Sequence, residues 1–274
     1  MIGAWLAALA LVAADLAVRA ARLQVLLGAQ RLPRLGGAVA VNALGDAASA
    51  ATPARLGGEP ARFLALRRRN TPGPAATVAL ATERVVDMGL AALVTLGAAG
   101  LLGTRGFGDV ADYAARFAQP AMLPWVLAVV ALLLAGAVAA VLLRSRFPRA
   151  DASVRDALAH ARSLGGRRLA LAVALTALSM AARVAVLPVL LWGAGALGNP
   201  VTAAVGSFAL IYAQLLLPTP AGAGGVELGF VLGVAPALAP GDVAGLLITW
   251  RVFTLAIPAG LGAVVFVTGR GRAD

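Results

Sequence analysis

Four charged residues lie inside long apolar stretches of the sequence. Glu83, Arg84 and Asp87 fall near the start of the stretch at about 75–103, and Arg251 falls inside the last one. A charge in the hydrocarbon core of a membrane costs about 2.5–3.5 kcal/mol on insertion scales, so such residues are candidates for function. The two carboxylates are four residues apart and share one helix face, and Arg84 could pair with a carboxylate from another helix. A structural ion-pair network is an equally good interpretation.

A second group of candidates lies in the segment PARLGGEPAR at positions 53–62. It contains two arginines, a carboxylate and two adjacent glycines: Arg55, Arg62, Glu59, Gly57 and Gly58. The glycines predict a tight turn with exposed N–H groups, and a half-helix N-terminus beside arginines is a good anion site. The forked donors of arginine suit a phosphate, and the glutamate could orient an arginine or carry a proton. An ordinary cytoplasmic loop is the alternative interpretation.

The segment PTPAGAGGVE at positions 218–227 is the counterpart of this motif. Its expected turn residues are Pro218, Pro220, Gly222, Gly224 and Gly225, and it ends in Glu227. These glycines are not a dinucleotide-binding fingerprint, because no strand precedes them. Glu227 could cap a short helix or act as the outer carboxylate of a relay. Asp15 and Asp46 are weaker candidates for the same cavity.

The composition excludes a soluble protein and several kinds of chemistry. The chain of 274 residues is 61% hydrophobic and 13% charged, whereas soluble domains carry roughly 25% charged residues. The net charge is +11, but the arginines fall in short loops without interleaved aromatics, so nucleic acid is not an expected partner. The absence of cysteine excludes disulfides and thiol catalysis. With no catalytic set, P-loop or metal-ligand cluster, we expect no enzyme, cofactor or metal, and we interpret His160 as a solvated loop residue.

The apolar stretches predict an all-α, polytopic membrane helix bundle that forms one domain over 1–274. Spans are expected at about 3–20, 75–103, 122–143, 168–195 and 242–268, with a surface helix at 151–164. The arginine-rich loops at 19–34, 55–69 and 144–168 should be cytoplasmic, and the charge-balanced loop 104–121 should face out. This predicts a cytoplasmic-membrane protein whose N-terminus is outside and whose C-terminus is cytoplasmic.

Two apolar stretches, 36–53 and 200–217, have both flanks on one side of the membrane. A spanning helix cannot satisfy this pattern, so each is predicted to be part of a re-entrant or broken hairpin. Irregular backbone is tolerated at membrane depth where protein covers it or a wet cavity adjoins it. A weak apolar piece follows the second stretch at 226–238.

An internal repeat relates the two motif segments. Thr52-Pro53 matches Thr219-Pro220 at an offset of 219 − 52 = 167, and the same offset aligns Arg84 with Arg251. The repeat halves are about 1–103 and 168–268, and 104–167 holds a crossover helix and a basic loop. Combined with the sidedness, this predicts an inverted-topology repeat, an architecture typical of transporters with sites near the midplane. Coincidence in a biased composition is the alternative.

Three motifs in this order and spacing resemble a known family over nearly the whole chain. They are P-x-R-x-G-G-E-x-x-R (53–62), E-R-x-x-D (83–87) and P-x-P-x-G-x-G-G-x-E (218–227), the last followed by Arg251 and Pro258. Together they resemble the transmembrane region of lysylphosphatidylglycerol synthase, also called the flippase-like domain family. The resemblance implies a membrane domain that moves, or helps to move, lipids between leaflets. Those synthases also carry a soluble domain that transfers lysine from tRNA; the chain ends six residues beyond its last predicted span, so we expect that activity to be absent.

We therefore expect a translocase for an anionic phospholipid or lipid-linked molecule. Four arginines would hold the phosphate and four carboxylates would hold the arginines or exchange protons: Arg55, Arg62, Arg84 and Arg251, with Glu59, Glu83, Asp87 and Glu227. Two alternatives stay open. The chain could be the membrane anchor of a partner aminoacyl- or glycosyl-transferase, or a non-transporting, lipid-binding scaffold.

Overall fold

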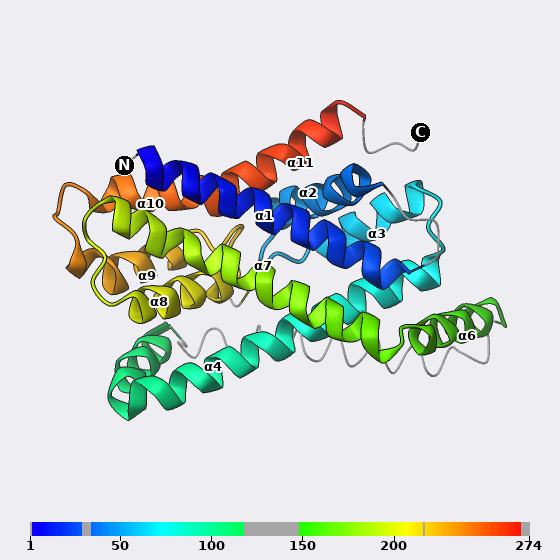
Figure 1. Cartoon of the computed structure of the whole chain (residues 1–274), viewed down its shortest axis with the longest axis horizontal. Coiled ribbons are helices and arrows are strands. Elements are labelled where there is room, and N and C mark those ends of the chain that lie inside the picture. Colours follow the sequence, from blue (N-terminus) through cyan, green and yellow to red (C-terminus); the bar gives the residue numbers. More distant parts are fainter. Residues whose placement is uncertain (1, 29–33, 118–147, 216, 270–274) are drawn as a thin grey trace.

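The described part of the protein is built from helices and the turns between them. A computed structural model describes residues 2–28, 34–117, 148–215 and 217–269, and over these ranges it has no strand, only one isolated β-bridge. In chain order the elements are α1 (Ile2–Leu27), α2 (Leu35–Ala51), α3 (Gly58–Arg68), α4 (Gly73–Phe117), α6 (Pro148–Ser163), α7 (Gly166–Gly193), α8 (Pro200–Ala213), α9 (Gly225–Gly233), the 3₁₀-helix η2 (Ala235–Ala237), α10 (Val243–Arg251), the π-helix η3 (Val252–Ala256) and α11 (Ile257–Val267) (Figure 1).

Three helices within the described ranges are long and apolar enough to cross a membrane. They are Ile2–Leu27, Gly166–Gly193 and the composite helix Val243–Val267. A helix rises about 1.5 Å per residue, so each can span a hydrocarbon core of about 30 Å. These helices match the spans expected at 3–20, 168–195 and 242–268, and the all-α membrane architecture is confirmed.

Two expected loops are helical instead. Helix α1 continues to Leu27, so Arg19 and Arg22 lie within it rather than in a following loop. Helix α4 continues to Phe117 through most of the loop expected at 104–121. In both places the sequence predicts a helix end at charged residues, but arginine is a good helix former, and in α1 the charges of Arg19 and Arg22 are paired with carboxylates of neighbouring helices. The span expected at 122–143 lies outside the described residues.

The helices repeat at the offset found in the sequence. Each half has a long helix followed by a helical hairpin: α1, α2 and α3 in the first, and α7, α8 and α9 in the second. The second hairpin helices begin at equivalent glycines, Gly58 and Gly225 (225 − 58 = 167). In Figure 1, α1 and α7 run in opposite directions, and the two hairpins approach the middle of the bundle from opposite ends. Their turns meet there through an antiparallel bridge between Pro53 and Pro220.

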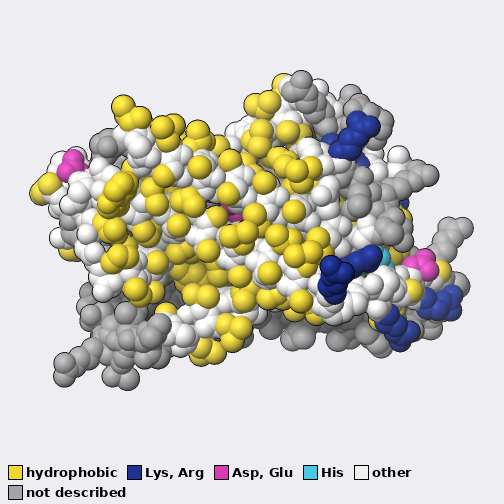
Figure 2. All heavy atoms as spheres, viewed as in Figure 1, with side chains coloured by type: hydrophobic (Ala, Val, Ile, Leu, Met, Phe, Trp, Pro, Cys, Tyr) yellow, Lys and Arg dark blue, Asp and Glu magenta, His cyan; other side chains and the backbone are white. Residues whose placement is uncertain are grey.

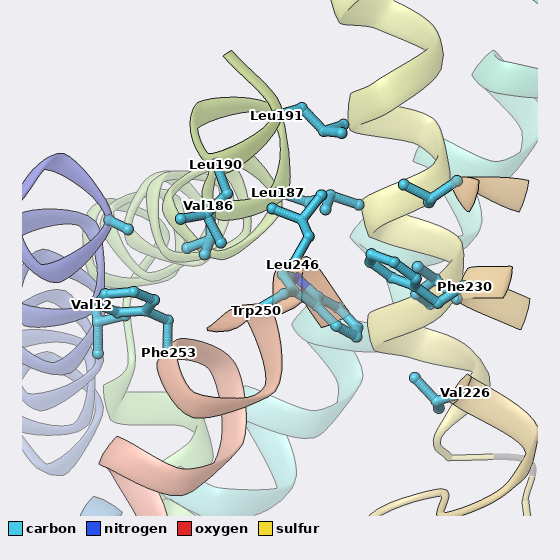
Figure 3. Close-up of a cluster of buried hydrophobic side chains, with 13 residues drawn as sticks. Val12, Val186, Leu187, Leu190, Leu191, Val226, Phe230, Leu246, Trp250 and Phe253 are labelled. Atoms are coloured by element: carbon cyan, nitrogen blue, oxygen red, sulfur yellow. The ribbon is translucent and has the colours of Figure 1, made fainter. Parts of the chain in front are cut away.

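Two apolar clusters hold the bundle together at either side of the hairpin turns. The larger one joins α1 and α7 to α8, α9, α10 and η3, and its centre is fully buried Trp250 and Phe230, whose ring centroids are 5.9 Å apart (Figure 3). The second joins α1 and α7 to α2, α3 and α4. Helix α11 packs closely on α2, because a Cβ at Gly262 would lie 1.9 Å from the carbonyl oxygen of Ala43. The hairpins are therefore fixed to the long helices.

Charge and apolar surface are segregated along the bundle. Apolar side chains cover the middle of the face seen in Figure 2, and arginines gather at the end that carries α6. The surface helix expected at 151–164 is present as α6. The interpretation of His160 as a solvated loop residue is wrong: it lies in α6, is buried, and its Nε2 is 3.1 Å from the carbonyl oxygen of Leu26. It satisfies one of the unpaired carbonyls in the last turn of α1.

Candidate functional site

The turn of the first hairpin is strained at positions other than its glycines. Ala54 and Arg55 have positive φ angles of 48° and 59°, whereas the adjacent glycines of the motif do not need that freedom. Gly58 instead allows close packing, since a Cβ there would lie 2.1 Å from Ser49 Oγ. The N–H of Gly57 donates to Thr52 Oγ1 at 2.8 Å. The expected anion site at exposed N–H groups of this turn is therefore not formed by Gly57.

The second hairpin turn follows the expected pattern more closely. Gly222 and Gly224 adopt positive φ angles of 69° and 86°. Glu227 caps α9, because its carboxylate accepts from the N–H of Gly224 at 2.7 Å. The other oxygen of this carboxylate accepts from Arg251 Nε at 2.8 Å, and Arg251 Nη1 donates to the carbonyl oxygen of Ala221 at 3.0 Å. The pair thus fastens α10 to the second turn.

A buried carboxylate in α4 joins arginines from two other helices. Glu83 is 1% exposed and accepts from Arg22 Nε at 3.0 Å through one oxygen and from Arg62 through the other. Arg22 also donates to Asp87 and, at 2.8 Å, to Thr176 of α7. The network therefore connects α1, α3, α4 and α7 around one carboxylate. Buried charges persist only when they are paired in this way.

A second network joins the middle of α1 to α2 and α7. Arg19 makes a bidentate contact with Asp46, at 2.9 and 2.8 Å, and a further contact with Asp15 at 3.0 Å. Arg183 Nε donates to the same Asp15 at 2.9 Å, and Ser179 also donates to it. These contacts hold the first hairpin against the two long helices.

Arg84 and Glu59 form the most exposed pair of the site. Their side chains are 41% and 35% exposed, and Arg84 Nη2 donates to Glu59 Oε1 at 2.8 Å. Glu59 lies in the first turn of α3, as Glu227 lies in the first turn of α9. Each half of the repeat therefore links the start of its second hairpin helix to an arginine at the equivalent position, Arg84 or Arg251.

The networks surround an open cavity of about 930 Å³. This charged cavity is bounded by α1, α2, α3, α4, α7 and α8, and its wall carries six arginines and three carboxylates: Arg19, Arg22, Arg55, Arg62, Arg84 and Arg183, with Asp46, Glu59 and Asp87. A second cavity of about 580 Å³ shares four of these charged side chains, namely Arg19, Asp46, Arg55 and Arg183, and extends to η3 and α11. Within the described ranges no three acidic or histidine side chains are grouped to hold a metal.

The structure gathers most, but not all, of the candidates. The charged cavity is lined by Arg55, Glu59, Arg62, Arg84 and Asp87, and Glu83 lies behind its wall; the weaker candidate Asp46 also lines it. Arg251 and Glu227 line neither cavity. The expectation that Arg251 shares a ligand with the other arginines is therefore not supported by its position. Whether the gathered residues bind a ligand stays a prediction.

Sequence reasoning missed three arginines of the cavity. The charge pattern assigns Arg19 and Arg22 to the loop after the first span, although Asp15, four residues before Arg19, indicates a pair within a helix. Arg183 lies inside the apolar stretch 168–195 and could have been found by the same cost argument that singled out Arg251.

Comparison with known protein families gives a match over most of the chain. The family described as "Lysylphosphatidylglycerol synthase TM region" matches residues 2–262. No curated protein and no solved structure matches the chain.

Proposed function

The chain belongs to the lysylphosphatidylglycerol synthase TM region family, and from this premise we propose that it translocates an anionic phospholipid or lipid-linked molecule across the cytoplasmic membrane. The observation that carries the proposal is the charged cavity, an arginine-rich space built between helices of a membrane protein. Arginine binds phosphate through a planar fork of donors and stays charged in a desolvated site. The proposed activity is transport rather than an enzymatic reaction.

The paired carboxylates explain how such a cavity is stable without a ligand. Glu83 and Asp46 form ion pairs with buried arginines of the wall. Most of the positive charge is therefore compensated, and the wall keeps only a small positive excess. Arg84 and Glu59 are the most exposed members and are the groups that an arriving head group would meet first. We propose that the head group moves through the charged cavity while the acyl chains stay in the surrounding lipid.

The hairpins support transport rather than simple lipid storage. They approach the middle from opposite ends and touch at Pro53 and Pro220, and the charged cavity lies beside this contact. Inverted repeats with broken helices place substrate sites near the midplane in many transporters, where one half can move against the other. We propose the predicted orientation, with the N-terminus outside and the arginine-rich end in the cytoplasm.

The test is leaflet exchange of a fluorescent phosphatidylglycerol in liposomes that contain the purified protein, read by quenching from outside. Liposomes without protein set the background. Arg84→Ala should slow exchange at least about tenfold, as expected for loss of a charged contact, whereas Arg68→Gln, at an exposed arginine in the last turn of α3, should not.

The main alternative is a membrane anchor for a partner transferase that acts on lipid, which the family description favours. It predicts no exchange for any of a panel of phospholipids and polyprenyl phosphates. It also predicts that a soluble transferase purifies with the protein and loses its lipid acceptor activity without it. Exchange that is equal in wild type and Arg84→Ala would contradict the role assigned to the charged cavity.

A further inference from the structure

The charges around the charged cavity do not balance. Six arginines line it, three carboxylates line it with them, and two further carboxylates pair with those arginines: Asp15, which lines the second cavity, and the buried Glu83. Six positive charges against five negative ones leave one positive charge. Within the described ranges Arg19, Arg22, Arg62, Arg84 and Arg183 each contact a carboxylate, so the surplus can be assigned to a particular residue.

That residue is Arg55. Its guanidinium has no carboxylate within ion-pair distance among the described residues, and its one hydrogen bond runs from Nη1 to Gln214 Oε1, at 3.2 Å, just beyond the end of α8 in the other half of the repeat. A neutral amide oxygen does not compensate a charge. Asp46 is the carboxylate that attracts Arg55, but both of its oxygens are bound by Arg19, so an anion in the cavity would complete the compensation of Arg55.

The position of Arg55 suits a group that meets a moving ligand. It lies in the hairpin turn, and it lines both the charged cavity and the second cavity. Arg19, Asp46 and Arg183 also line both, but they are tied to carboxylate or arginine partners. The backbone at Arg55 has a φ of 59°, a left-handed conformation that is uncommon for a residue other than glycine and is enriched at functional sites.

We propose, resting on the proposed function, that Arg55 is the residue that binds the phosphate of the lipid, and that the site accepts a head group with a single net negative charge, a phosphodiester with an uncharged polar substituent. One such charge neutralises the surplus. A phosphomonoester, whose second pKa is about 6, would bring nearly two charges at about pH 8 and leave the site negative. A head group with an ammonium would find the nearby carboxylates already held by arginines.

Arg55 can bind a phosphate without leaving the second hairpin. A guanidinium has five N–H donors, and Gln214 takes one of them. The remaining edge can bind two phosphate oxygens side by side. Gln214 is buried and therefore holds the orientation of this edge, so it is a positioning residue for the same contact.

The experiment is equilibrium binding to the purified full chain in a nonionic detergent at about pH 8, measured by native mass spectrometry. The probes are phosphatidylglycerol, phosphatidic acid and phosphatidylethanolamine with the same acyl chains. Wild type should bind phosphatidylglycerol most tightly. Arg55→Gln should weaken this binding at least about tenfold and remove the preference, whereas the matched variant Arg68→Gln should leave both unchanged.

Two further measurements distinguish a lost binding site from a misfolded protein and a lipid head group from free phosphate. Arg55→Lys keeps the charge but loses the fork, so it should retain the preference for one negative charge with weaker binding; this separates a lost site from a misfolded protein. Soluble glycerophosphoglycerol should compete with phosphatidylglycerol, whereas inorganic phosphate at the same concentration should compete less. Phosphatidic acid binding as tightly as phosphatidylglycerol, or unchanged binding by Arg55→Gln, would overturn the proposal. Binding that follows the expected pattern without leaflet exchange would overturn the translocase and leave this site standing.

Discussion

Replacing Glu83 by glutamine should destabilise the protein by about 3 kcal/mol. The carboxylate is 1% exposed and is shared by Arg22 and Arg62, so the neutral amide leaves two buried guanidinium groups short of one counter-charge. Breaking a buried ion pair from one side costs about 3–5 kcal/mol. The lower end applies because Arg22 keeps Asp87, and Arg62 keeps a weaker contact with Glu59 at 3.4 Å.

This loss can be measured by unfolding the protein in mixed micelles with increasing sodium dodecyl sulfate, followed by tryptophan fluorescence. Asp87→Asn is the matched control: this carboxylate is 31% exposed and, among the residues that the structure describes, forms an ion pair with Arg22 alone, so its loss should be about 1 kcal/mol. The double variant Arg62→Gln/Glu83→Gln should be less destabilised than the sum of its single variants, because it removes a positive charge together with the negative one.

A loss below about 1 kcal/mol for Glu83→Gln, or a loss equal to that of Asp87→Asn, would refute the reasoning. Either result would mean that water or rearranged side chains compensate the two arginines. The ion pairs in the wall of the charged cavity would then be less fixed than their distances indicate. The assignment of the surplus positive charge to Arg55 would no longer hold, because it depends on those fixed pairs.

Three other predictions follow from the packing and the repeat. Gly262→Ala should lower the stability in the same unfolding assay by about 1–3 kcal/mol, because the new methyl group would lie 1.9 Å from the Ala43 carbonyl oxygen. Gly260→Ala in the same helix is the control: its methyl group would meet no atom within 4 Å, so it should not lower the stability. Since the chain has no cysteine, the double variant Pro53→Cys/Pro220→Cys should form a single disulfide on mild oxidation, seen as a gel shift that reductant reverses. The reason is that the Cα atoms of bridge partners in antiparallel backbone lie about 4.5–5.5 Å apart, which is within the reach of a disulfide. A failure to cross-link would contradict the contact of the two turns. Single cysteines placed near the two ends of the chain should react with impermeant maleimide from opposite sides of the membrane, and labelling from the same side would contradict the proposed orientation.

The long elements could be predicted from sequence because they depend on local patterns. The helix Gly166–Gly193 agrees with the stretch expected at 168–195 to within two residues, and the two hairpin turns fall at the Thr-Pro pairs that reveal the repeat. The partners within the site could not be predicted in this way. Arg22 finds Glu83 61 residues away, and nothing in the local sequence of either residue specifies the other.

The roles of the motif glycines were also beyond local reasoning. Turn chemistry predicts left-handed backbone at glycine, but in the first hairpin Ala54 and Arg55 take that conformation, held by the pairing of this turn with the second hairpin. Gly58 serves the packing of α3 on α2. A tertiary contact thus decides which residue of the turn is strained.

The two halves of the repeat differ in the charge of their equivalent residues, and this difference bears on the proposed passage of lipid between the two leaflets. Four charged residues of the first half correspond, at the repeat offset, to uncharged residues of the second half: Arg19, Arg22, Arg62 and Glu83 correspond to Val186, Val189, Gly229 and Trp250. At these four positions only the first half carries charges, although the second half has charged residues of its own in Arg183, Glu227 and Arg251. Under the proposed function, a head group that enters beside the first half would meet more arginines than one that enters beside the second half. This difference would make the two directions of the proposed passage kinetically unequal, although without an energy source it cannot change the final distribution of lipid between leaflets.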